Sequence, residues 1–342
     1  MKRTTVDLHS RKSEVLVGEC LGNLGKYIDG RQNFIITDKN LDKLYRKQFP
    51  RTPVYVVEPG EKSKSLETVA AICRWLLEQG ADRSSFITGI GGGVVCDLAG
   101  FVASTYMRGI GFGFVATSLL AQVDASIGGK NGVNLDGYKN IIGTFTQPEF
   151  VICDVDMLLT LPENEFVCGM SEVIKHALIE DRDHFEHLWN YSTRILSKDR
   201  NEMEQIVTHS VAIKAAVVER DEREQGERRK LNLGHTWGHA VETVAGLPHG
   251  EAVAVGLAFA AGLSVSRGSL TEEERERIIR LLGMYDLPVE TQARPADIFD
   301  VLVKDKKREA GALWFILMNG IGNVSIEAIG TDELKNYALN DT

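Results

Sequence analysis

The sequence lacks the features that mark several large classes of protein. Its five cysteines are scattered over 342 residues without a CxxC pair, which suits reduced thiols better than a disulfide framework. It is also short of basic residues, since 39 Lys and Arg stand against 48 Asp and Glu, and the formal net charge is −9. Because binding to a phosphate backbone depends on a basic surface, this balance argues against a nucleic-acid partner.

Long apolar runs are scarce as well. The N-terminal residues lack the apolar core of a signal peptide. The longest apolar run, residues 252–266, is short for a membrane span and rich in Ala and Gly. We interpret it as a buried helix and predict a cytoplasmic protein without a membrane partner. The chain exceeds the size at which one core usually stops growing, so two domains are expected.

Strand-like and helix-like segments alternate in the first half of the chain. Residues 32–38, 53–58 and 85–93 are short apolar runs of strand type, and residues 65–80 between the last two have helical spacing with Ser65 as a cap. Such alternation predicts an α/β domain with parallel strands. From about residue 161 long helical patterns dominate, which predicts a mostly α-helical second domain.

A glycine-rich segment, GIGGGVVCD at residues 89–97, follows a predicted strand and precedes a predicted helix. Glycines at such a turn let the backbone approach a pyrophosphate, which the helix N-terminus attracts. The segment departs from the GxGxxG fingerprint because Val94 stands at the third glycine position. A dinucleotide site, with Asp38 near the ribose or adenine, and an ordinary tight turn therefore both remain open.

Three histidines, His235, His239 and His249, lie within fifteen residues. The first two are four residues apart and share a helix face, and the third follows a Gly/Pro turn. Imidazole is a common zinc ligand, and a catalytic zinc site takes three protein ligands. The alternative is that these histidines cap helices or bond within the core. Glu172, with Lys175 beside it, could add a carboxylate ligand or form an ordinary salt pair.

Several blocks resemble the 3-dehydroquinate synthase family. In the family's order they are GIGGGVVCDLAGFVAST, LLAQVDASIGGKNGVN, KNIIGTFTQP, GMSEVIKHALI, ERRKLNLGHTWGHAVE, LPHGEAV, and DKK followed by ILMNGIG. The resemblance runs from about residue 30 to 325. It implies a Rossmann-like α/β domain over residues 1–160 that binds NAD, and a mostly α-helical domain over residues 161–342 that binds Zn²⁺ or Co²⁺. It also implies a homodimer.

The resemblance carries site residues onto this sequence. It implies Glu172, His235 and His249 as the metal ligands, which replaces the pairing of His235 with His239. The implied NAD-binding residues are Asp38, Glu61, Lys64, Gly91, Gly92, Gly93, Val94, Val95, Asp97, Thr117, Ser118, Lys139 and Thr160. The implied catalytic and substrate-binding residues are Arg108, Asp124, Lys130, Asn140, Lys175, Lys214, Arg228, Asn232, His239, Lys306 and Lys307. The departures from the family pattern are Cys96, Ser118 and Asn131.

The activity that the resemblance implies is that of a carbon–oxygen lyase of the shikimate pathway, which leads to chorismate and the aromatic amino acids. The enzyme would convert 3-deoxy-D-arabino-heptulosonate 7-phosphate to 3-dehydroquinate and phosphate by transient oxidation with NAD, phosphate elimination, re-reduction and aldol cyclisation. A small substrate with a carboxylate and a phosphate would account for the many implied cations. The alternatives are a metal-dependent polyol dehydrogenase of the glycerol type, a sister sugar-phosphate cyclase, and a non-catalytic binding or scaffold protein.

Overall fold

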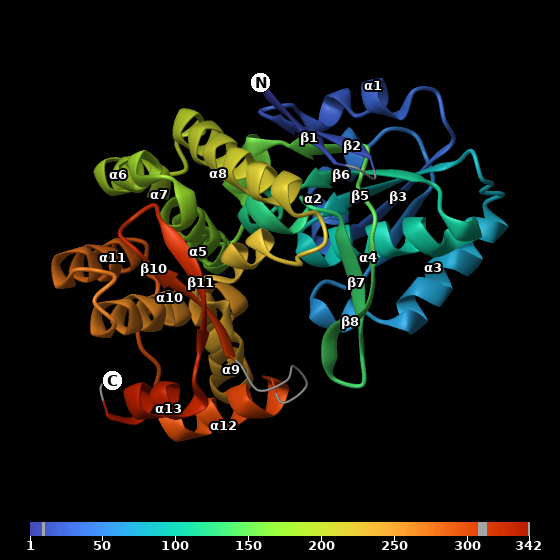
Figure 1. Cartoon of the computed structure of the whole chain (residues 1–342). Coiled ribbons are helices and arrows are strands. Elements are labelled where there is room, and N and C mark those ends of the chain that lie inside the picture. The colour runs from blue at the N-terminus through green and yellow to red at the C-terminus, as the bar shows by residue number, and fades with distance from the viewer. Residues whose placement is uncertain (9–10, 307–312, 341–342) are drawn as a thin grey trace. The chain divides into compact units, whose positions relative to one another are not determined.

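The computed structural model describes residues 1–8, 11–306 and 313–340, and the chain forms two compact units (Figure 1). Unit 1 consists of Met1–Pro162 and Met203–Glu222, and unit 2 of Glu163–Glu202 and Arg223–Thr342. Residues 203–222 belong to unit 1 although they follow the division predicted near residue 160. The assignment of NAD to one domain and the metal to the other stays a prediction.

Unit 1 is built on a seven-stranded sheet with the order β1-β2-β9-β6-β5-β3-β4. Its strands are β1 (Lys2–Asp7), β2 (Lys12–Val17), β3 (Asn33–Asp38), β4 (Val54–Val57), β5 (Phe86–Gly91), β6 (Gly111–Ala116) and β9 (Phe150–Cys153). Only the pair β1 and β2 is antiparallel, and β2 and the other five strands pair in parallel. Every residue of β5 and β9 is buried, as expected of strands covered on both faces. The predicted parallel sheet is confirmed.

The helices and turns of unit 1 connect these strands or follow the last of them. They are η1 (Leu21–Asn23), α1 (Gly25–Ile28), α2 (Lys39–Tyr45), η2 (Arg46–Gln48), η3 (Glu61–Ser63), α3 (Leu66–Glu78), α4 (Gly93–Thr105), η4 (Tyr106–Arg108), η5 (Ala121–Ala125), η6 (Val155–Thr160) and α8 (Arg200–Arg220). The hydroxyl of Ser65 accepts a hydrogen bond from the Thr68 amide, which confirms its predicted role as the cap of α3. A separate antiparallel hairpin joins β7 (Lys130–Leu135) to β8 (Tyr138–Phe145).

Helix α8 from Met203 onward belongs to unit 1, and contacts of its side chains show why. Glu219 accepts a hydrogen bond from the Asp7 amide at 2.7 Å, and Lys214 forms an ion pair with Asp124 at 2.7 Å. These partners lie far away in the sequence, so helical periodicity alone could not assign α8 to this unit.

Unit 2 is mostly helical, as predicted. Its elements are α5 (Glu163–Glu180), α6 (Arg182–Asn190), α7 (Ser192–Leu196), η7 (Glu227–Asn232), α9 (His235–Ala245), α10 (His249–Ser266), α11 (Glu272–Met284), α12 (Pro295–Lys306), β10 (Leu313–Met318), β11 (Val324–Ile329) and α13 (Thr331–Asn340). Strands β10 and β11 form an antiparallel hairpin that the sequence did not suggest. In the core of unit 2, Trp237 stacks on Phe259 with ring centroids 4.0 Å apart.

Helix α10 lies at the centre of unit 2, in contact with α5, α9 and α11 (Figure 1). It is long and apolar enough to cross a membrane by length and composition, but 78% of this apolar stretch, His249–Ser266, is buried inside the protein. This confirms the predicted core helix. Two glycines permit its close packing. A Cβ atom added at Gly256 would lie 1.9 Å from the carbonyl oxygen of Gly234. One added at Gly250 would lie 2.3 Å from the carbonyl oxygen of Cys168. The absence of side chains there lets α10 approach α5 and the start of α9.

Candidate metal and nucleotide sites

In unit 1 the glycine-rich segment forms the predicted turn between a strand and a helix. Strand β5 ends at Gly91, Gly92 caps α4, and Gly93 is the first helical residue. The Gly92 cap has no side chain to bond the first amides of α4, so these amides and the positive end of the helix dipole face outward from the turn. A Cβ at Gly92 would lie 3.2 Å from the Ser118 hydroxyl oxygen. The turn therefore has the backbone arrangement that suits a phosphate group.

Lys64 lies beside this turn and joins several predicted site residues. It is 4% exposed, and its ammonium group donates to Asp97 Oδ2 at 2.7 Å and to Asn140 Oδ1 at 2.5 Å. Glu61 is 3.5 Å from the same ammonium and accepts from Asn134. Burial raises the pKa of the Asp97 carboxyl, although the charge of Lys64 acts in the opposite direction. The structure thus places predicted NAD-binding and substrate-binding side chains in one network.

Other predicted NAD-binding residues have structural contacts of their own. Thr117 donates its amide to the Gly91 carbonyl at 3.0 Å, which ties β6 to the glycine turn. Asp38 caps α2 by accepting from two amides, and the hydroxyls of Thr160 and Tyr45 lie 2.7 Å apart. Val94 and Val95 lie in the first turn of α4, and Lys139 is exposed on β8. The role of these residues in binding NAD stays a prediction.

Two of the departures from the family pattern, Cys96 and Asn131, have structural explanations. Cys96 is buried within α4, where its thiol points to the Gly91 carbonyl at 3.8 Å, and burial raises its pKa well above the usual value. It therefore belongs to the helix rather than to the turn itself. Asn131 donates to the carbonyls of Gly129 and Thr146, both at 2.9 Å, and supports the start of β7.

Predicted substrate-binding residues of unit 1 lie at unusual backbone positions or in buried pairs. Arg108 has φ of 70° and Asn140 has φ of 53°, both in the left-handed region that non-glycine residues seldom adopt. Such strain gathers at functional sites. Lys214 is 5% exposed and donates to the Asp124 carboxylate at 2.7 Å and to its main-chain carbonyl. Lys130 is exposed at the start of β7.

In unit 2, Glu172, His235 and His249 each present one ligand atom, and these atoms all lie within 4.8 Å of one another. His235 Nε2 is 3.5 Å and His249 Nε2 is 3.8 Å from Glu172 Oε1. Glu172 is fully buried within α5, whereas His235 and His249 are the first residues of α9 and α10. Three helices thus bring one carboxylate and two imidazoles together.

In each imidazole, Nε2 faces Glu172, and the other ring nitrogen, Nδ1, has its own hydrogen-bond partner. His235 Nδ1 donates to the Leu233 carbonyl at 3.2 Å, and His249 Nδ1 lies 3.1 Å from Glu242 Oε2. Because a carbonyl only accepts, Nδ1 of His235 carries the hydrogen and its Nε2 presents a lone pair toward Glu172. Imidazoles that bind metals commonly have such a carbonyl or carboxylate partner.

The pKa values of the two histidines move in opposite directions. Burial, followed by the charge of Lys175, lowers the pKa of His235 to about 3, so this imidazole is neutral near pH 7. Burial also disfavours the charged form of His249, but its hydrogen bond to Glu242 and the charge of Glu172 outweigh that effect and raise its pKa. A metal ion would take the position at Nε2 that a proton otherwise occupies.

A second set of possible ligands, His239, Glu242 and His249, also has its ligand atoms within 4.8 Å. It shares His249 with the first set, but it includes an exposed histidine, His239, and Glu242, which faces Nδ1 of His249. The first set combines a fully buried carboxylate with two imidazoles whose outer nitrogens are engaged. It therefore fits a metal ion better.

The remaining predicted residues of unit 2 lie in α5, η7 and α12 or outside the described residues. Lys175 is 1% exposed and forms an ion pair with Glu172, and Arg228 is 2% exposed in η7. Asn232 donates to Glu224 Oε1 at 2.7 Å. Lys306 is the last residue of α12, and Lys307 lies outside the described residues.

Sequence reasoning missed Glu224 and Glu242. Each carboxylate accepts from a predicted site residue, Asn232 and His249 respectively. Glu224 precedes Arg228 in the ERRKLNLGHT block by four residues, and Glu242 follows His235 by seven, which on a helix is the same face. The spacing on α9 could have suggested Glu242, but only the structure shows that the carboxylate meets His249.

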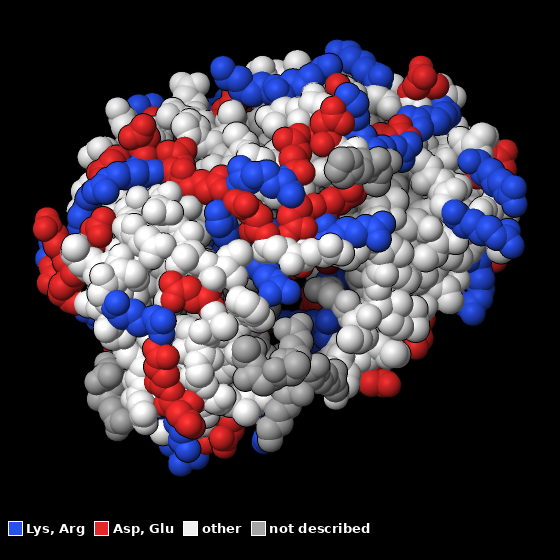
Figure 2. All heavy atoms as spheres, in the orientation of Figure 1, with Lys and Arg blue, Asp and Glu red and all other residues white. Residues whose placement is uncertain are grey.

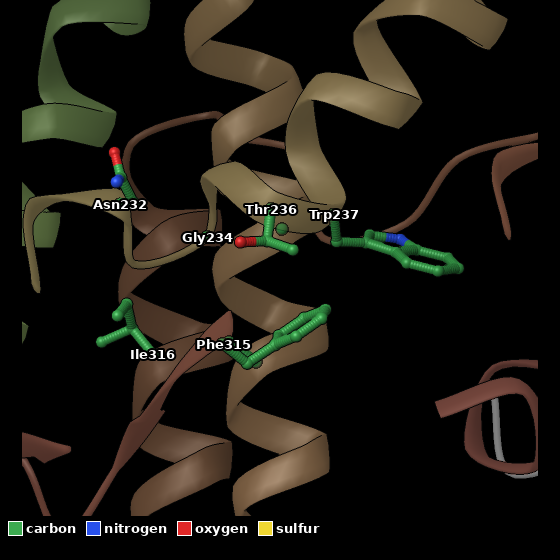
Figure 3. Close-up of a pocket in the computed structure, with 8 residues that line it drawn as sticks. Asn232, Gly234, Thr236, Trp237, Phe315 and Ile316 are labelled. Atoms are coloured by element: carbon green, nitrogen blue, oxygen red, sulfur yellow. The ribbon is translucent and has the colours of Figure 1, made fainter. Parts of the chain in front are cut away.

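Asn232 also lines a small pocket at the start of α9 (Figure 3). Its other lining residues come from the start of α9, from α10 and from β10, and they are Gly234, Thr236, Trp237, Gly256, Ala260, Phe315 and Ile316. The hairpin that the sequence did not predict thus supports the helix that begins with His235.

Several of the predicted anion-binding cations are buried, although charged side chains of both signs are interspersed on the surface in Figure 2. Lys64, Lys175 and Lys214 are each at most 5% exposed and paired with a carboxylate. Lys and Arg are almost never fully buried unless they are paired. In each pair the carboxylate offsets the cost of burying the lysine charge.

Comparisons with known proteins agree with this geometry. The family model described as 3-dehydroquinate synthase N-terminal matches residues 54–168, and the one described as C-terminal matches residues 169–308. A 3-dehydroquinate synthase of Alkaliphilus metalliredigens is 39% identical over 355 aligned positions that cover 98% of each chain. The chain belongs to the 3-dehydroquinate synthase family. The predicted resemblance to this family of enzymes is confirmed, and the polyol dehydrogenase alternative is not favoured.

Two solved structures share the fold at 26% identity. A 2-deoxy-scyllo-inosose synthase in complex with carbaglucose-6-phosphate, NAD⁺ and Co²⁺ has a TM-score of 0.86 and covers 98% of this chain and 99% of its own. A 2-epi-5-epi-valiolone synthase from Streptomyces hygroscopicus with NAD⁺ and Zn²⁺ has a TM-score of 0.88 and covers 96% of both chains. The predicted fold class, a Rossmann-like domain with a helical domain, is confirmed.

Proposed function

We propose that this chain is a carbon–oxygen lyase that converts 3-deoxy-D-arabino-heptulosonate 7-phosphate to 3-dehydroquinate and phosphate, using NAD and a divalent metal ion. The observation that carries the proposal is the convergence of Glu172, His235 and His249 within 4.8 Å in a member of this family. The relatives at 39–48% identity bear the name of this activity. We further propose that the enzyme is a cytoplasmic homodimer.

The donor set of unit 2 fits a catalytic zinc or cobalt ion. Two neutral nitrogens and one carboxylate make up the three protein ligands of an open site. When bound, the ion would supply Lewis-acid stabilisation of a substrate hydroxyl during its oxidation. Glu172 is held from one side by Lys175, and each histidine is held through Nδ1, so these side chains are oriented before any ion arrives.

The turn between β5 and α4 fits the pyrophosphate of NAD. When bound, NAD would accept a hydride from the substrate and later return it. The residues of the turn would orient the cofactor through the free amides at the start of α4. Lys64, held by Asp97 and Asn140, would add a positive charge beside it.

Buried cations of each unit, taken separately, offer partners for a carboxylate or a phosphate. Arg228 offers a planar fork suited to a carboxylate, and Lys214, oriented by Asp124, offers a point charge. Fixed positive charge in a desolvated position would stabilise the negative charge that accumulates as phosphate leaves. The chain would therefore contribute position and charge, while the cofactor carries the hydride.

One assay tests the proposed reaction. The purified protein is mixed with the heptulosonate phosphate, zinc and NAD well below the substrate concentration, and phosphate release is followed together with the nicotinamide absorbance. We expect phosphate to be released in many-fold excess over NAD with no lasting increase of NADH. Stoichiometric accumulation of NADH without phosphate would contradict the proposal and point to a dehydrogenase.

Replacing Arg228 with lysine tests the predicted substrate contact. The variant keeps the charge but loses the fork, so we expect the KM for the heptulosonate phosphate to rise about tenfold or more, the equivalent of one charged hydrogen bond of about 1.5–3 kcal/mol. Arg229→Lys is the matched control. Arg229 is the next residue after Arg228, and its guanidinium carbon lies 5.3 Å from the centroid of the Trp314 ring. An unchanged KM in Arg228→Lys would remove Arg228 from the substrate site.

A further inference from the structure

We propose that Glu242 is a positioning residue that holds the His249 imidazole in the orientation needed for metal binding at Nε2. Its carboxylate Oε2 lies 3.1 Å from His249 Nδ1, on the side of the ring away from Glu172. The inference rests on the proposed metal site of Glu172, His235 and His249, and adds a residue that does not itself contact the ion.

The hydrogen bond determines which nitrogen of His249 is available. A carboxylate accepts hydrogen bonds, so a neutral His249 beside Glu242 carries its hydrogen on Nδ1 and leaves the lone pair on Nε2. That nitrogen is 3.8 Å from Glu172 Oε1, within the candidate ligand set. Without Glu242 the ring could carry its hydrogen on either nitrogen and rotate about its side-chain bonds.

The two histidines differ in how their rings are held. The partner of His235 is the main-chain carbonyl of Leu233, which no side-chain substitution removes. The partner of His249 is a side chain seven residues along α9 from His235, and the His249 side chain is 35% exposed. The orientation of the His249 ring therefore depends on a side-chain contact that a substitution can remove, whereas that of the His235 ring does not.

Glu242 also links two helices that both begin with a candidate ligand. It lies on α9, which starts at His235, and bonds the first residue of α10. The close approach of these helices is secured by the backbone contact at Gly256. Removal of the Glu242 carboxylate should thus disturb the His249 ring without separating the helices.

Metal affinity of the whole protein, measured for Zn²⁺ by chelator competition, tests this role. We expect Glu242→Ala to weaken affinity by roughly 10- to 100-fold, the range found for outer partners of metal-binding histidines. Glu242→Gln, which keeps a hydrogen-bond acceptor, should recover part of the loss. The visible spectrum of the Co²⁺-loaded protein should change in Glu242→Ala, because the position of one nitrogen ligand changes. Thr243→Ala, at the exposed next residue of α9, is the matched control and should bind as the wild type does.

The outcomes separate this inference from the proposed site. If Glu172→Ala loses the metal while Glu242→Ala binds as the wild type does, the positioning role is wrong and the site stands. If Glu172→Ala binds normally, the proposed site and this inference both fall. If the chain binds two ions, and His239→Ala and Glu242→Ala each remove one of them, Glu242 is a direct ligand in the set with His239 and His249, and the positioning role is again wrong.

Discussion

Replacing His249 with alanine is expected to abolish both metal retention and turnover. The substitution removes one of three ligands from a cluster whose other members, Glu172 and His235, cannot surround an ion alone. The loss of affinity should exceed the roughly 100-fold upper range found when only an outer partner is removed. Metal content after gel filtration, measured by atomic emission, and phosphate release under saturating substrate check the two expectations separately.

Two comparisons make the His249→Ala result specific. His209→Ala removes a histidine of α8 in unit 1, outside the candidate ligand set, and should retain the metal. NAD affinity of His249→Ala should remain near that of the wild type, because the predicted NAD-binding residues all belong to unit 1. A fully active His249→Ala protein without metal would show that the ligand assignment is wrong.

Replacing Gly256 with alanine is expected to have the largest effect on stability among the substitutions considered. The new Cβ would lie 1.9 Å from the Gly234 carbonyl oxygen and 2.9 Å from the Gly238 nitrogen, so backbone must move. Overpacking of a core typically costs about 1–3 kcal/mol, and a clash with backbone should reach or exceed that range. Because Gly234 immediately precedes His235, the shift should also weaken metal binding. Denaturant unfolding and chelator competition measure the two effects.

Gly283→Ala is the matched control for this substitution. Gly283 lies in α11, and a Cβ there would meet nothing within 4 Å. Alanine in a helix is preferred to glycine, so this variant should be as stable as the wild type or more stable by about 0.5–1 kcal/mol. Equal stability of Gly256→Ala and the wild type would mean that α10 does not pack against the backbone of Gly234 at the start of α9.

Several parts of the fold could be predicted from local sequence. The alternation around residues 85–93 predicted a strand followed by a glycine turn, and β5 ends at Gly91 with α4 starting at Gly93. Ser65 followed by helical spacing predicted the capped helix α3. The Ala- and Gly-rich apolar run predicted a core helix, which is α10. In each case neighbouring residues carry the signal, because strand and helix periods and caps act over a few positions.

Contacts between distant segments were beyond that kind of reasoning. The hairpin of β10 and β11 lies in a region of helical patterns, and its pairing depends on partners across a turn. Helix α8 belongs to unit 1 through Lys214 and Glu219, whose partners are more than eighty residues away. Cys96 belongs to the glycine-rich block by sequence, but it is buried within α4, where its thiol packs against the end of β5.

The sequence by itself determined the parallel α/β organisation, the helical second half, the family, and the types of residue available as ligands. His235 and His239 share a helix face by spacing, and the spacing alone favoured them as a pair. Only the tertiary structure decided that His235 and His249 turn Nε2 toward the buried Glu172, and that Glu242 holds His249 from behind. The physical reason is that helical period relates residues within one helix, whereas the meeting of side chains from α5, α9 and α10 depends on how closely their backbones pack.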